Sequence, residues 1–119
     1  MAKRIVRLTR HEAGETQLAE LRRIFGKDAT IEMVSETLPG NSREAVTRFD
    51  EIAAEADVVE AVLPVNLLEA VLKFSAFSKR GGLVVRAITE RKLGGDGQAT
   101  FVFQRYELVK KVEIVTEVL

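Results

Sequence analysis

Cysteine is missing from the 119-residue chain, and histidine occurs once, at position 11. Without cysteine there is no disulfide, no zinc–thiolate or iron–sulfur site and no cysteine nucleophile. A single histidine excludes a metal site built from several imidazoles of one chain. Glu12, Glu36 and Glu90 fall in three different predicted loops, but nothing in their spacing requires a Mg²⁺ site. No cofactor is identified.

Long hydrophobic runs are missing as well. No segment approaches the roughly 20 apolar residues that span a bilayer. Residues 1–8 include basic side chains but no apolar stretch behind them, as a secretory signal would have. We therefore expect a cytoplasmic protein with no membrane contact.

The usual phosphate-binding and nucleophile motifs do not occur. The first strand–helix turn lacks Gly-x-Gly-x-x-Gly, and the chain has no Gly-x-x-x-x-Gly-Lys-Ser/Thr. No Gly-x-Ser-x-Gly surrounds Ser35 or Ser42. These absences argue against a classical dinucleotide site, a P-loop NTPase and a nucleophile elbow. The glycine-rich residues 94–97 lie between extended segments and predict a hairpin turn.

Net charge is also absent, because 18 Lys and Arg residues balance 18 Asp and Glu residues. Acidic residues predominate in the first half of the chain and basic residues in the second, which favours self-association or an anionic ligand. Phe101, Phe103 and Tyr106 lie near basic residues and could stack on bases. However, Phe101 and Phe103 alternate as core residues do, so the sequence argues against nucleic acid as a partner without excluding it.

What the chain does contain is a regular alternation of extended and helical segments. With 46% hydrophobic and 30% charged residues, it has the composition of a globular protein. Apolar residues recur at helical spacing between the extended segments. The predicted strands are residues 5–8, 30–35, 57–63, 83–92, 100–108 and 112–119, and the predicted helices are residues 15–26, 42–56 and 65–79.

This alternation of strands and helices predicts a single α/β domain over residues 1–119. Crossover helices make the first four strands parallel, in the order 2-1-3-4, with helices on both faces. The C-terminal strands then add to one edge in antiparallel fashion. The pattern resembles small Rossmann-like and flavodoxin-like three-layer sandwiches, a resemblance that implies a fold and no function.

Ligands of open parallel sheets bind beyond the carboxyl ends of the strands. An arginine there, and a helix N-terminus beginning near Asn41, would suit a phosphate or a carboxylate. A plainer reading is that Asn41 and Ser42 cap a helix while Arg43 is solvated. The predicted ligand-binding residues are Arg10, His11, Glu36, Asn41, Ser42, Arg43 and Asn66.

Three functions remain open. The first is a small soluble binding or sensing module, acting as a homodimer, that recognises a phosphate- or nucleotide-bearing ligand at this edge. The second is a phosphoester hydrolase using Arg10, His11 and Glu36. His11 could form a general acid–base pair with Glu12 or Glu36, because histidine titrates near neutral pH. The third is a structural homo-oligomer subunit without a ligand, whose interface uses the apolar helix 65–79 and the terminal strands. The sequence does not decide whether the protein is an enzyme.

Overall fold

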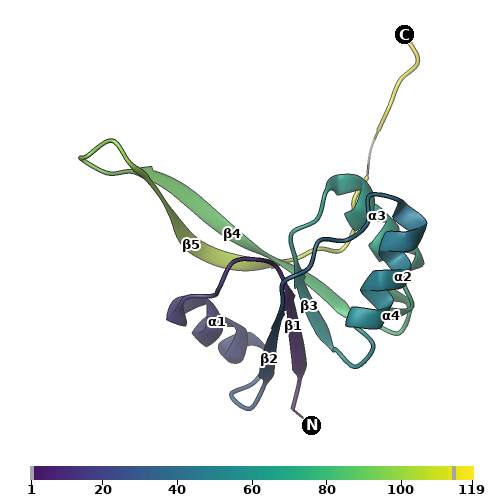
Figure 1. Ribbon diagram of the computed structural model, residues 1–119, viewed down its shortest axis with the longest axis horizontal. Coiled ribbons are helices and arrows are strands. Elements are labelled where there is room, and N and C mark those ends of the chain that lie inside the picture. The colour runs from purple at the N-terminus through teal and green to yellow at the C-terminus, as the bar shows by residue number, and fades with distance from the viewer. Residues whose placement is uncertain (1, 114) are drawn as a thin grey trace.

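The computed structural model describes residues 2–113 and 115–119 and shows an α/β fold (Figure 1). The elements alternate along most of the chain, as the sequence predicts. Its strands are β1 (Arg4–Leu8), β2 (Thr30–Val34), β3 (Val58–Ala61), β4 (Leu83–Leu93) and β5 (Ala99–Leu108), and its helices are α1 (Glu15–Phe25), α2 (Ser42–Ile52), α3 (Val65–Phe74) and α4 (Ala76–Lys79).

The sheet confirms the predicted topology, with the order β2-β1-β3-β4-β5. The first four strands are parallel, because a helical crossover returns the chain to the same end of the sheet each time. β5 pairs with β4 in antiparallel fashion after a tight turn. In that turn Gly97 has a φ of 80°, a conformation that favours glycine, and the Gly94 N–H donates to the Gln98 carbonyl at 2.8 Å.

Helices cover both faces of the sheet, which gives three layers. In Figure 1, α1 lies on one side of β1–β3 and α2, α3 and α4 lie on the other. The larger core lies under α2–α4, where the fully buried rings of Phe49 and Phe77 meet edge to face at 5.6 Å. The smaller core lies under α1, where Leu21 packs against the sheet. The single helix α1 therefore covers much less of its face of the sheet than α2, α3 and α4 cover of the other face.

The predicted helix 65–79 is wrong at Ser75, where the structure has two helices instead of one. Ser75 is fully buried and extended, and its hydroxyl accepts a hydrogen bond from the Ser78 N–H. Ser75 thus ends α3 and caps α4. The break turns Phe77 into the core while Phe74 stays 65% exposed.

The predicted strand 112–119 is also wrong, since residues 109–113 and 115–119 lie in no strand. Ile114, which that prediction included, lies outside the described residues. The reason is the register of the sheet. Leu108 pairs with Val85, and β4 begins only two residues before that, at Leu83, so the chain soon runs past the end of its partner.

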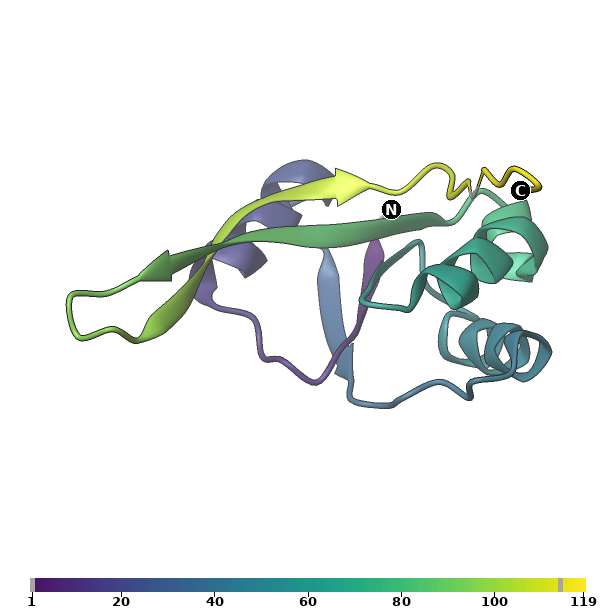
Figure 2. The same cartoon turned by 90° about the horizontal axis from the view of Figure 1, so that it is seen from above.

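The far halves of β4 and β5 form an arm that projects beyond the helices (Figure 2). Its residues 89–102 are exposed. Among the described residues, no helix combines the length and the apolar character that crossing a membrane requires.

Candidate functional site

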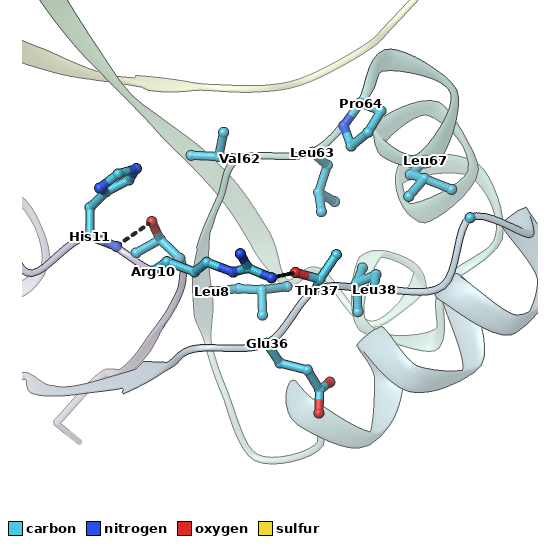
Figure 3. Close-up of a pocket in the computed structure, with 12 residues that line it drawn as sticks. Leu8, Arg10, His11, Glu36, Thr37, Leu38, Val62, Leu63, Pro64 and Leu67 are labelled. Carbon is cyan, nitrogen blue, oxygen red and sulfur yellow. Dashed lines mark hydrogen bonds between the residues drawn. The ribbon is translucent and has the colours of Figure 1, made fainter.

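The carboxyl ends of β1, β2 and β3 surround a pocket of about 310 Å³, at the edge where the sequence places a ligand (Figure 3). We call it the leucine pocket, because four leucines form much of its wall. It is lined by Leu8, Thr9, Arg10, His11, Glu36, Thr37, Leu38, Gly40, Val62, Leu63, Pro64 and Leu67. The structure therefore brings Arg10, His11 and Glu36 to one cavity.

Arg10 reaches across the leucine pocket from the end of β1 to the loop after β2 (Figure 3). Its Nη2 donates to the hydroxyl of Thr37. The side chain is exposed and is held by the hydrogen bond to Thr37. Among the described residues, no carboxylate forms an ion pair with it. Within that part of the chain, Arg10 is a free cation next to an apolar wall.

Glu36 lines the same pocket but is held by another group. Arg48 of α2 donates to its two carboxylate oxygens at 2.7 and 2.9 Å. These charge-assisted hydrogen bonds hold the pKa of Glu36 below its ordinary value. In Figure 3 the carboxylate points toward α2, away from Arg10 and His11.

His11 lies at another side of the pocket, away from the Glu36 carboxylate (Figure 3). Its backbone N–H donates to the Thr9 hydroxyl at 3.2 Å, and its side chain is exposed. An acid–base pair of His11 with Glu36, as the hydrolase hypothesis requires, gains no support from this arrangement.

Asn41 caps α2, as the plainer reading of the sequence has it. Its Oδ1 accepts from the backbone N–H groups of Arg43 and Glu44 at 3.0 and 3.2 Å. Two of the free N–H groups that would otherwise face an anion are thereby occupied. Because Asn41 caps α2, fewer N–H groups at this helix N-terminus are free to bind an anion.

The other predicted residues lie apart from the leucine pocket. Ser42 and Arg43 line a separate hollow of about 410 Å³ beside Phe74. Asn66 is exposed in the first turn of α3. Of the seven predicted ligand-binding residues, four therefore do not line the leucine pocket: Asn41, Ser42, Arg43 and Asn66.

A buried polar cluster on the α1 face of the sheet was not predicted from the sequence. Arg7 of β1 and Glu60 of β3 are neighbours in register, with only 3% and 2% of their surfaces exposed. Nε and Nη2 of Arg7 donate to the Glu60 carboxylate at 3.0 and 3.3 Å, and the Tyr106 hydroxyl donates to it at 2.6 Å. Burial and the Glu60 carboxylate together raise the pKa of Tyr106.

A signal for this cluster does exist in the sequence. Arg7 and Glu60 each interrupt an otherwise apolar strand of a sheet that is predicted to have helices on both faces. Charged side chains are almost never fully buried unless they are paired. Because the predicted strand order makes these two strands neighbours, their opposite charges are natural candidates for a buried pair.

In the part of the chain that the structure describes, no group of three or more histidine, aspartate or glutamate side chains is arranged to hold a metal ion. Comparisons with protein-family models, with curated proteins and with solved structures found no match to this chain. The site must therefore be interpreted from its own geometry.

Proposed function

We propose that the protein is a small binding or sensing module, and that the leucine pocket takes a small ligand with one anionic group and one apolar part. A single observation carries this proposal. Arg10, a cation without a carboxylate partner among the described residues, lies next to a leucine wall at the carboxyl edge of a parallel sheet.

The two parts of the ligand follow from the two kinds of lining. A guanidinium has five N–H donors in a planar fork, and only one of Arg10's is bonded to Thr37. The others suit the oxygens of a phosphate or a carboxylate. Leu38, Leu63 and Leu67 suit the apolar part.

The size of the pocket narrows the ligand further. Its volume of about 310 Å³ lies at the lower end of the range of about 300–1,000 Å³ typical of ligand pockets. This favours a phosphorylated or carboxylated small molecule, up to a mononucleotide, over a dinucleotide. It agrees with the absence of a glycine-rich dinucleotide motif.

The test is a calorimetric titration of the full-length protein with phosphate, pyrophosphate, AMP and hexanoate at low salt. We expect saturable binding of at least one probe, and a loss of about tenfold or more in affinity for Arg10→Ala. Arg43→Ala is the matched control, because Arg43 is an exposed arginine outside the leucine pocket. Absence of binding by all four probes would overturn the proposal, and so would equal losses in the two variants.

A homo-oligomeric assembly subunit is a second candidate, favoured by the apolar residues that the monomer leaves uncovered. Val115 and Val118 of the C-terminal segment are 85% and 97% exposed, and Leu119 is exposed as well. β2 and β5 have no further strand beside them in the described part of the chain, and open edges invite pairing. Light scattering of the full chain should then give a dimer, and deletion of residues 112–119 a monomer. A monomeric full chain would remove this candidate.

The hydrolase alternative has no comparable observation. Glu36, a proposed acid–base partner of His11, is bonded to Arg48 through both carboxylate oxygens. We therefore do not put it forward.

A further inference from the structure

A second cavity, of about 550 Å³, lies on the α1 face of the sheet, and we call it the aromatic pocket. We propose that it binds the flat ring of an uncharged heteroaromatic compound, such as a nucleobase or nicotinamide. It is lined by Arg7, Thr9, His11, Gln17, Glu60, Val62, Ala87, Thr89, Phe101 and Phe103. Thr9, His11 and Val62 also line the leucine pocket, because they lie at the strand ends between the two cavities.

The pocket is lined by a buried ion pair, Arg7 with Glu60. Removing two charges from water is costly, and such pairs are often replaced by apolar residues without loss of stability. This pair borders a cavity instead of lying wholly within a packed core. With a ligand in this cavity, Arg7 and Glu60 would contribute to binding as well as to folding.

Arg7 keeps hydrogen-bonding capacity for that ligand. It donates two hydrogen bonds to Glu60 and one, at 3.1 Å, to the His11 carbonyl. A guanidinium has five donors, so N–H groups of Arg7 remain uncommitted. Because Glu60 cancels the charge of Arg7, this side of the pocket is polar but neutral and suits an uncharged partner.

The aromatic side of the pocket comes from β5, on the arm that projects past α1. Phe101 and Phe103 lie two residues apart and share a face of the strand. A register shift between Ile88 and Thr89 brings Tyr106 to the same side, with its ring 5.0 Å from that of Phe103. The prediction that Phe101 is a core residue is wrong, since it is 70% exposed.

The exposed ring of Phe101 indicates the shape of the ligand. An aromatic side chain left open beside a cavity offers its face for stacking, and stacking tolerates any flat ring. Val62, also 70% exposed, adds a further apolar side chain to the pocket lining.

Uncharged polar side chains complete the lining and suit the edge of a heteroaromatic ring. The Gln17 amide and the hydroxyls of Thr9 and Thr89 can each donate and accept hydrogen bonds. Ring nitrogens, exocyclic amines and carbonyls need both kinds of partner. The Thr9 hydroxyl and the Gln17 amide oxygen each accept one hydrogen bond from a backbone N–H, of His11 and Gly14, and keep further donor and acceptor capacity. A purely hydrocarbon ring would displace water from that remaining capacity without replacing its hydrogen bonds, which is unfavourable.

The experiment is a calorimetric titration of the full-length protein with four uncharged probes: adenosine, cytidine, uridine and nicotinamide. We expect saturable binding of at least one, and no binding of ribose alone. Phe101→Ala should weaken that binding about tenfold or more. Thr89→Val, which keeps the shape and removes the hydroxyl, should weaken it about threefold or more.

Two controls distinguish binding in the aromatic pocket from adhesion to the arm and from binding in the leucine pocket. Leu93→Ala removes an apolar side chain that is 72% exposed on the same arm but does not line the aromatic pocket, and should leave affinity unchanged. Arg10→Ala should also leave it unchanged, because Arg10 lines only the leucine pocket of the two. Failure of all four probes to bind would overturn the inference. Equal losses for Phe101→Ala and Leu93→Ala would overturn it as well, since binding would then be nonspecific adhesion to the arm.

Discussion

Arg7, Glu60 and Tyr106 show how single residues are held in this protein. They come from three different strands and form hydrogen bonds with one another. Among the described residues, no buried side-chain nitrogen or oxygen lacks a hydrogen bond. Deleting one member of a buried ion pair leaves the other charge uncompensated, at a cost of about 3–5 kcal/mol. The cluster thus ties β1, β3 and β5 together on the face that α1 covers only in part.

The ionisation of Tyr106 tests this cluster, because it is the only tyrosine and the chain has no tryptophan. Burial and the Glu60 carboxylate raise its pKa above the ordinary value of 10.0. An alkaline titration followed by tyrosinate absorbance should therefore have a higher midpoint in the folded protein than in the same protein in concentrated urea.

The direction of the stability change follows from the same shift. Below the ordinary pKa, tyrosine is neutral in both states and the stabilisation is complete. As pH rises above that value, the unfolded chain ionises first, so the free energy of unfolding should fall. Equal midpoints in the folded and the unfolded protein would contradict both the burial of Tyr106 and its hydrogen bond to Glu60.

At the scale of the element, α4 shows how tertiary contacts make a helix that could not form alone. Four residues are far too few for a stable isolated helix. The Asp50 carboxylate of α2 accepts from the backbone N–H groups of Ala76 and Phe77 at 3.0 and 3.1 Å. At the other end, Arg80 donates to the Ala53 carbonyl at 2.6 Å and lies over the Phe77 ring, 5.1 Å from its centroid.

Gly82, three residues after the end of α4, must remain glycine for a packing reason. A Cβ at that position would overlap the ring of Phe77, which is fully buried and cannot move aside. Gly82→Ala should therefore lower the free energy of unfolding in urea by about 1–3 kcal/mol, the usual cost of overpacking. Gly95→Ala is the matched control, since its Cβ would meet nothing within 4 Å. It should change stability by less than about 0.5 kcal/mol. Equal effects of the two substitutions would show that Phe77 does not constrain Gly82.

At the scale of the whole molecule, the projecting arm and the extended C-terminal segment make the protein less compact than its length implies (Figure 1). The radius of gyration is 15.7 Å, against about 13–14 Å for a compact domain of this length. Figure 2 shows β4 and β5 continuing as a two-stranded ribbon beyond the layers of helices. Such ribbons are marginally stable in water by themselves.

Hydrogen exchange should be slow in the central strand β3 and fast in the projecting arm. Amides of β3 are paired on both sides and buried, so they should exchange only through global unfolding. Amides of residues 89–102 should exchange much faster, because pairing between two strands is their only protection. Mass spectrometry of peptic fragments from the monomer measures both. Slow exchange throughout the arm would contradict an independent ribbon.

The sequence by itself determined the features that depend on neighbouring residues. Hydrophobic periodicity placed the strands and helices, the one-helix crossovers made the strands parallel, and the glycines of residues 94–97 made the hairpin. Asn41 caps α2 for the same local reason, because its side chain bonds to backbone groups two and three residues on. Placing ligands at the strand ends was enough to locate a pocket that contains Arg10, His11 and Glu36.

Only the tertiary structure decided which distant groups meet. Glu36 is bonded to Arg48 because α2 lies beside the loop that follows β2. Arg7 lies opposite Glu60 because β3 pairs with β1 in that register. Residues 112–119 have a strand-like alternation, yet the described ones form no strand where the sheet offers nothing beside them. A side chain's chemistry is a property of its own residue, whereas its partner is set by register and packing between segments far apart in the chain.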